Sequence, residues 1–388
     1  MSIPVPQPRP TVAGLPGYVA GRRSTSAQTA ALASNESHEP PLPGVIEAIT
    51  AQAQRANRYP DMAAVALREA LAAHVGVQPE QIAVGAGSVS VLQQIVTAYC
   101  DAGDEVIFAW RSFEAYPILT AIAGAVAVKV PLRPDESHDL AAMAGAVNDR
   151  TKVILLCSPN NPTGVPLGID EIVGFLGQVP PDVLVVLDEA YLEYHDAGRA
   201  ETKARFESPE AKEGADERSE EHADDPDGAR SLALLAQHPN LCLLRTLSKA
   251  WGLAGLRVGY AVACAEIAEA LRRTAIPFGV SAVAQAAGIA ALAAADEVRT
   301  RAARVVAERG RVIEALRSAG WQTPDSAANF VWLRAGEELL GQLMEAFDAA
   351  DILVRGYAGD GVRISLADPA ANDRVLAVLA DRGRFAAQ

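Results

Sequence analysis

The stretch Arg245–Tyr260, "RTLSKAWGLAGLRVGY", holds a single lysine, Lys249, among small and apolar residues, and Arg257 follows eight positions later. It overlaps the end of "NLCLLRTLS", a run apolar enough to form a buried strand. Lysine is rarely buried without a partner. The chain has only five lysines among its 34 Lys and Arg residues. A lysine in this setting therefore indicates chemistry rather than generic surface charge.

The length and composition set the first limits on the fold and the partners. A chain of 388 residues is too long for one ordinary compact domain, which predicts one large and one smaller domain. Half of the residues are hydrophobic, enough for a sizeable core. The net charge of −14 argues against a nucleic-acid partner, because nucleic-acid binders normally carry a basic face.

The cysteines and the N-terminus predict a cytoplasmic protein. The cysteines form no CxxC pair and no His/Cys cluster at metal spacing, so we expect reduced, packed thiols and no metal site. The first residues, "MSIPVPQPRPTVAGLPGY", lack the apolar segment of a signal peptide. No apolar run reaches about 18 residues, so no membrane span is expected. The four cysteines are Cys100, Cys157, Cys242 and Cys264.

Short apolar runs alternate with longer helical patterns in the first two thirds of the chain. The runs are those expected of strands covered on both faces. Their alternation with helices predicts an α/β fold with a doubly wound, mostly parallel sheet. From about Ala284 a long helical segment leads into "NFVWLR" and "GVRISLAD", which predicts a smaller α+β domain. The expected strands span residues 104–110, 125–132, 151–158, 183–191 and 240–248, and the expected helices include 88–100 and 168–179.

These patterns divide the chain at residues 1–44, 45–285 and 286–388. The first part is a proline-rich arm that wraps onto the smaller domain or reaches a partner, the second is the large domain, and the third is the small one. Within the large domain, Gly198–Arg230 contains 11 acidic and 6 basic residues and almost no apolar ones. Such a segment cannot offset its ordering entropy by burial, which predicts a mobile surface insertion. It is either a solvated loop without catalytic role or a partner-binding segment.

Polar residues follow several of the expected strands, where ligands of doubly wound sheets bind. The loop "SPNNPTG" presents Asn160 and Asn161, although Asn-Pro pairs are also common in loops that have no functional role. Asp188 ends the next strand as a helix cap or as a cation's partner, and Glu189 and Tyr191 follow it. Ser248, Lys249 and Arg257 follow a third strand. A glycine turn in "AVGAGSVSVLQQ" opens a helix, where free amides favour an anion.

Together these groups are the parts of a pyridoxal phosphate site. A lysine forms the Schiff base, a carboxylate holds the pyridinium nitrogen, and the phosphate needs amides, a hydroxyl and a cation. The sequence resembles the fold-type I, aspartate-aminotransferase-like enzymes, and within them the histidinol-phosphate aminotransferase group. The resemblance runs from about Leu15 to Arg382, interrupted only by the acidic insertion. It rests jointly on "NRYPD", "SPNNPTG", "DEAYLEY", "TLSKAWGLAGLRVGY" and "VRISLAD".

The resemblance implies a role for each matching residue around the cofactor ring. Lys249 holds pyridoxal 5'-phosphate covalently and then moves the substrate α-proton, which requires an amine that burial and neighbouring positive charge keep largely neutral. Asp188 pairs with the pyridine nitrogen. Asn161 and Tyr191 hydrogen-bond the phenolic oxygen, and Phe113 stacks on the ring.

The phosphate end is implied in the same way. Its residues are the helix-opening Gly87, Ser88 and Val89, together with Ser248 and Arg257. Tyr59 of "NRYPD" reaches the phosphate from the neighbouring subunit, which implies a homodimer with sites at the interface.

For the amino acid and 2-oxo acid substrates, Arg363 takes the α-carboxylate as a bidentate pair, a task suited to a planar guanidinium. Arg355 is the second cation of the pocket, with a solvated surface arginine as the alternative. Asn35 also contacts the substrate. Tyr18 lines the mouth of the site, or else is a core or surface residue. Aromatic substrates pack against Tyr18, Phe113 and Tyr116.

The chain departs from the commonest histidinol-phosphate pattern in two places. The helix opening reads Gly87-Ser88-Val89-Ser90 instead of Gly-Ser-Asp-Glu, and the early Asn-Glu-Asn is Asn35-Glu36-Ser37. "AVGAGSVSVLQQ", "WRSFEAYP" and "ANFVWL" are most similar to aromatic aminotransferases of the actinobacterial type.

The resemblance thus implies transfer of an amino group from an aromatic amino acid to 2-oxoglutarate in two half-reactions. The alternatives are histidinol-phosphate transamination, decarboxylation of threonine phosphate, and a non-catalytic sensor domain of a transcription regulator. The sensor is disfavoured because the first 44 residues leave no room for a DNA-binding helix-turn-helix.

Overall fold

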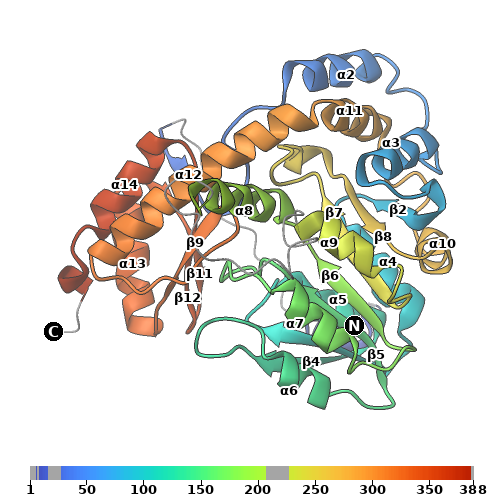
Figure 1. The fold of residues 1–388 in the computed structure, drawn as a ribbon, viewed down its shortest axis with the longest axis horizontal. Helices are drawn as coiled ribbons and strands as arrows, with labels where there is room; N and C mark the ends of the chain where they lie inside the picture. Colours follow the sequence, from blue (N-terminus) through green and yellow to red (C-terminus); the bar gives the residue numbers. More distant parts are fainter. Residues whose placement is uncertain (1–5, 7, 16–27, 207–226, 386–388) are drawn as a thin grey trace, which may run out of the picture.

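Among the described residues, seven strands form the central sheet, and five of the eight helices that cover it lie between its strands in the sequence (Figure 1). The computed structural model describes residues 6, 8–15, 28–206 and 227–385. Strands β4, β3, β5, β6 and β7 are mutually parallel, and β8 is antiparallel to both of its neighbours, β7 and β2. The sheet order is β2 (Ile82–Gly85), β8 (Gly259–Val262), β7 (Leu241–Thr246), β6 (Leu184–Asp188), β5 (Thr151–Cys157), β3 (Glu105–Trp110) and β4 (Val126–Pro131). The predicted α/β class with a mostly parallel sheet is confirmed.

The apolar strands are buried on both faces because each face has its own core. In β5, Ile154 and Leu156 belong to one core, whereas Val153 and Leu155 belong to the other. This alternation follows from the two-residue period of a strand. One face is covered by α4 (Ser88–Tyr99), α5 (Ala115–Ala123) and α10 (Ala265–Arg273), the other by α3 (Val65–Val75), α6 (Leu140–Gly145), α7 (Ile169–Leu176), α9 (Asp227–Leu234) and α11 (Ala282–Ala293).

Three strands differ from the sequence expectation. The run 125–132 is apolar, yet β4 is the edge strand of the sheet and Val126 is 50% exposed. Strands β2 and β8 were not among the expected strands, because each has only four residues and ends or begins at a glycine.

A second, smaller antiparallel sheet has the order β11 (Arg355–Tyr357), β12 (Gly361–Ser365) and β9 (Phe330–Arg334). Helices α12 (Ala295–Ser318), α13 (Glu337–Ala349) and α14 (Pro369–Leu379) lie beside it (Figure 1). The long helical segment expected from Ala284 is two helices, because α11 ends at Ala293 and α12 starts at Ala295. Helix α2 (Pro43–Ala53) packs against α11.

The described part of the N-terminal arm contacts the smaller sheet and a helix that covers the larger one. Strand β1 (Ala30–Ala31) pairs in parallel with β10 (Ile352–Leu353), next to the smaller sheet. The short helix α1 (Pro10–Ala13), however, contacts α5 of the larger sheet, and Arg9 donates a hydrogen bond to the carbonyl of Ile122. The arm therefore does not lie on the smaller domain alone.

The acidic insertion is not a loop throughout. Helix α8 (Leu192–Phe206) includes its first residues and α9 includes its last ones, while residues 207–226 lie outside the described residues. Helix α8 packs against α12 (Figure 1). The expectation of an irregular segment over all of Gly198–Arg230 is wrong at both ends, where packing against α12 and the sheet outweighs the polar composition.

Among the residues described, no helix combines the length and apolar character needed to cross a membrane.

Candidate active site

A pocket of about 580 Å³ lies at the carboxyl ends of the parallel strands and is lined by residues of both sheets. The strand register aligns these ends, because Cys157 of β5 pairs with Asp188 of β6, which in turn pairs with Leu244 of β7. Twelve residues predicted for the site line this pocket: Asn35, Ser88, Val89, Phe113, Asn161, Asp188, Tyr191, Ser248, Lys249, Arg257, Arg355 and Arg363. Gly87 immediately precedes them at the start of α4.

Lys249 stands three residues beyond the end of β7, in the wall of the pocket. Its Nζ donates a hydrogen bond to the carbonyl of Ser34 at 3.2 Å and lies 5.8 Å from the centre of the Tyr191 ring. Burial, reinforced by the positive charge of Arg363, lowers the pKa of Lys249 to about 8. A far larger fraction of this amine than of an ordinary lysine is therefore neutral and nucleophilic near neutral pH.

Asp188 ends β6 with its carboxylate buried at the floor of the pocket. One oxygen accepts a hydrogen bond from the Tyr116 hydroxyl at 2.8 Å, and the other accepts one from the Ala190 amide at 3.2 Å. Burial raises the pKa of Asp188 to about 6, and the two hydrogen bonds limit this rise. The group is thus a carboxylate at neutral pH that is short of a positive partner.

Tyr116 was expected to pack against the substrate, and that expectation is wrong. It is fully buried in the core between the sheet and α5, where its ring contacts Phe108 and Phe113. Its hydroxyl donates a hydrogen bond to Asp188, so Tyr116 contacts that carboxylate from the core and not from the pocket.

Arg363 and Asn161 join the two sheets. Arg363 of β12 donates one hydrogen bond to Asn161 Oδ1 at 2.5 Å and another to the carbonyl of Ala33 at 2.6 Å. Its Nε is buried and has no hydrogen-bond partner among the described residues. Asn35 donates to the Tyr191 hydroxyl at 3.0 Å.

The anion-binding end combines a helix N-terminus with a guanidinium. Arg257 Nη1 donates to Ser248 Oγ at 3.3 Å, next to the first turn of α4. Gly87 has φ +80°, and a Cβ there would lie 2.1 Å from Arg257 Nη2. Gly259 is equally confined, because its Cβ would lie 2.1 Å from the Ser88 amide. Only glycine at these two positions lets the arginine lie against the helix start, where both favour an anion.

Sequence reasoning overlooked Glu114, which also lines the pocket. Its carboxylate forms an ion pair with Arg355 at 2.7 Å. The signal available in the sequence was an acidic residue directly after Phe113, at the end of an expected strand.

One predicted residue that the structure describes, Tyr59, is not brought into the pocket. Tyr59 is 84% exposed and stacks on Phe278 at a separate surface pocket, with ring centres 4.9 Å apart. Tyr18 lies outside the described residues. Within the described ranges, no group of three His, Cys, Asp or Glu side chains is placed to hold a metal ion.

Residues 28–379 match the model of the family described as aminotransferase class I and II. The chain belongs to the class I and II aminotransferases. The family resemblance inferred from the motifs is confirmed.

Named relatives and solved structures match this aminotransferase over nearly all of its length. It is 48% identical to the aromatic amino acid aminotransferase of Streptomyces coelicolor over 380 residues, which covers 97% of this chain and 98% of that one. It is 50% identical to the protein of the same name from Rhodococcus erythropolis, covering 95% and 94%. The histidinol-phosphate aminotransferase of Sinorhizobium meliloti, solved with pyridoxal-5'-phosphate, superposes with a TM-score of 0.81 at 29% identity and 97% coverage of both chains.

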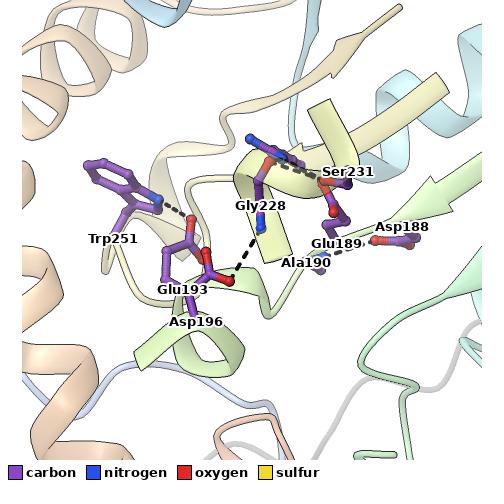
Figure 2. Close-up of polar contacts among 9 residues, drawn as sticks. Asp188, Glu189, Ala190, Glu193, Asp196, Gly228, Ser231 and Trp251 are labelled. Atoms are coloured by element: carbon purple, nitrogen blue, oxygen red, sulfur yellow. Dashed lines mark hydrogen bonds and ion pairs between the residues drawn. The ribbon is translucent and has the colours of Figure 1, made fainter. Parts of the chain in front are cut away.

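A buried polar network lies behind the site of this aminotransferase. Arg245 Nε donates to Glu189 Oε2 at 2.7 Å, and its Nη2 donates to the carbonyl of Gly228 at 3.0 Å. Glu193 accepts a hydrogen bond from the Trp251 indole at 2.6 Å, and Asp196 accepts one from the Gly228 amide. Figure 2 shows both contacts. The network ties both α8 and α9 to the strand ends that carry Asp188 and Lys249. Arg245, a charged residue inside an apolar strand, was its sequence signal.

We predict that Glu189→Ala lowers the free energy of unfolding by about 3–5 kcal/mol, because it leaves the Arg245 charge buried without its carboxylate. Denaturant unfolding of cofactor-free enzyme at one fixed protein concentration measures this effect. Glu269→Ala, which breaks the exposed pair with Arg273, is the matched control and changes stability by at most about 1 kcal/mol. Equal losses in the two variants would contradict a structural role for the buried pair.

Proposed function

We propose that the chain is a pyridoxal phosphate-dependent aminotransferase that transfers the amino group of aromatic amino acids to 2-oxoglutarate. The observation that carries the chemistry is the placement of Lys249, with its lowered pKa, in one pocket with Asp188 and the Arg257 anion site. The aromatic donor is supported by full-length relatives at 45–50% identity that carry that name.

The residues of the pocket fit the cofactor in charge and in hydrogen-bonding chemistry. Asp188 supplies a buried carboxylate for a protonated pyridine nitrogen. That positive charge would offset the burial that raises the pKa of Asp188. Gly87 and Gly259 carry no side chain that would displace Arg257 or the start of α4, so both of these can face a phosphate beside Ser248. Phe113 lines the pocket and offers a ring face for stacking. The bound cofactor would act as an electron sink for the substrate Cα.

Each chain residue then has a task of its own. Lys249 in its neutral form would hold the cofactor covalently, and its Nζ would carry the substrate α-proton. The Ser34 carbonyl orients this amine without adding a full negative charge, so its pKa stays low. Asn161 and Tyr191 supply an amide and a phenol for the cofactor's phenolic oxygen. Arg363, with Nε still unpartnered, receives the α-carboxylate of the substrate.

Histidinol phosphate is the competing donor, supported by the likeness to the Sinorhizobium meliloti structure. Its phosphate would meet Arg355, but that guanidinium is already paired with Glu114. A carboxylate at this place repels a dianion, which favours the aromatic donor.

We predict that phenylalanine and tyrosine convert the holoenzyme to its pyridoxamine form, and that histidinol phosphate does so at least roughly tenfold more slowly because Glu114 repels its phosphate. Absorbance spectra in single half-reactions measure the rates. Lys249→Ala serves as the inactive control. A preference for histidinol phosphate, or release of an amine and carbon dioxide, would contradict the proposed function.

A second prediction concerns Tyr116→Phe. The change removes a hydrogen bond that lowers the pKa of Asp188, so this pKa rises above about 6. Below its pKa the carboxylate is neutral and cannot pair with the pyridinium. As the pH is lowered, the cofactor affinity of the variant, measured by fluorescence titration, should therefore begin to fall at a higher pH than that of the wild type. In mild alkali the two affinities should be equal.

Tyr99→Phe is the control for this experiment, because Tyr99 is a half-buried tyrosine of α4 for which no hydrogen bond to Asp188 is seen. An unchanged pH profile in Tyr116→Phe would show that the hydroxyl does not act on the carboxylate.

We further propose a homodimer in which Tyr59 reaches the phosphate end of the partner's pocket. In support, Tyr59 is exposed beside an apolar patch that comprises Met62, Ile276 and Phe278. Exposed apolar side chains that cluster in this way are typical of protein interfaces.

The four cysteines are free, which supports a cytoplasmic location. The division into domains at residues 45–285 and 286–388 stays part of this proposal, since each sheet lies mainly within one range.

We predict that Ile276→Asp converts the dimer to monomers in sedimentation experiments and lowers cofactor affinity, because a charge would be buried at the interface. Val126→Asp, a change at an exposed apolar residue on the β4 edge, leaves the dimer intact. Tyr59→Phe keeps the dimer and lowers cofactor affinity alone. A wild-type protein that sediments as a monomer would contradict the proposal.

A further inference from the structure

Two arginines of the smaller sheet face the pocket side by side. Arg355 of β11 and Arg363 of β12 are directly opposite in the antiparallel register, so their side chains lie on the same face of the sheet. Both line the pocket, and both guanidinium groups lie near the Tyr357 ring, at 5.6 and 5.8 Å from its centre. Adjacent cations of this kind match a ligand with two carboxylates.

The two arginines differ in their partners. Arg363 is held by neutral groups, the Asn161 amide oxygen and the Ala33 carbonyl. Arg355 is held by the full negative charge of Glu114, which comes from the opposite side of the pocket, between β3 and α5. The pair is largely shielded, with the Arg355 side chain 13% and the Glu114 side chain 29% exposed. Arg363 is therefore free to neutralise an incoming anion, whereas the charge of Arg355 is already balanced.

Resting on the aminotransferase function proposed above, we propose that Glu114 determines how this pocket divides its affinity between aromatic and dicarboxylic substrates. With a ring in the pocket, Glu114 stays on Arg355 and the wall beside the ring is electrically neutral. With a dicarboxylate, the distal carboxylate competes with Glu114 for Arg355, while the α-carboxylate occupies Arg363.

The physical cause is the cost of an unbalanced charge in a shielded place. A ring next to an unpaired guanidinium would desolvate that cation without compensation, which is unfavourable. A second carboxylate next to Glu114 adds repulsion between like charges. The pair therefore raises the affinity for the ring and lowers the affinity for the dicarboxylate. This brings the two affinities closer together, so that one pocket can accept both.

The test compares the holoenzyme with Glu114→Gln, which keeps the shape and removes the charge. The probes are two unreactive acids that share the carboxylate for Arg363: 3-phenylpropionate, which ends in a ring, and glutarate, which ends in a second carboxylate. Titration calorimetry gives their Kd values. We expect glutarate to bind roughly fivefold to tenfold more tightly and 3-phenylpropionate to bind severalfold more weakly, the scale of one charge interaction in a partly shielded site.

Asp360→Asn is the matched control. Asp360 pairs with Arg111 and likewise connects the loop after β3 to the smaller sheet, but neither residue lines the pocket. We expect its two Kd values to stay within about twofold of the wild type. Glu114→Asp, which retains the charge, should restore the wild-type ratio at least in part.

An unchanged ratio of the two Kd values in Glu114→Gln, or an equal change in Asp360→Asn, overturns this inference. Half-reactions of the wild type with phenylalanine and glutamate keep the two proposals apart. A wild type that reacts with both, combined with an unchanged ratio in Glu114→Gln, refutes the role of Glu114 alone. A wild type that does not react with phenylalanine refutes the aromatic function instead.

Discussion

The hydrogen bond from Arg363 to Asn161 connects the two sheets across the pocket, and the geometry of the site depends on it. Asn161 follows a strand of the larger sheet, and Arg363 belongs to the middle strand of the smaller one. The ion pair of Glu114 with Arg355 makes a second connection of the same kind. Because each connection joins a loop after a parallel strand to the smaller sheet, a shift of either sheet would separate the substrate cations from Lys249.

The pocket also depends on a balance of buried charge. Lys249, Arg257 and Arg363 place positive charge around a cavity that the buried Asp188 also lines. Burial lowers the pKa of the lysine and raises that of the aspartate. Both shifts reduce the charge that is buried around the cavity, and both would be reversed in part when an anion and a cation of the ligand enter. The same groups therefore hold the ligand and tune the reactive amine.

Much of the site could be predicted because it lies where parallel strands end. Asp188 and Lys249 follow apolar runs long enough to be recognised as strands, and the topology brings such ends together. The contributions of Tyr116 and Glu114 could not be predicted, because they depend on the direction of each side chain out of the segment that follows β3. Three residues within a span of four positions face different ways there: Phe113 and Glu114 line the pocket, and Tyr116 enters the core. The helical ends of the acidic insertion depend on the packing of α8 against α12 and of α9 against the larger sheet, which local composition does not encode.

The most consequential contacts without any sequence signal come from the backbone before α2. The carbonyls of Ala33 and Ser34 accept hydrogen bonds from Arg363 and Lys249. A carboxylate in the place of either carbonyl would hold the cation more strongly, but it would raise the pKa of Lys249 and compete with the substrate for Arg363. A carbonyl carries only a partial charge, so it orients each group and leaves the amine nucleophilic and the guanidinium available. Any residue type can supply such a carbonyl, which explains why a pattern of side chains does not reveal this part of the site.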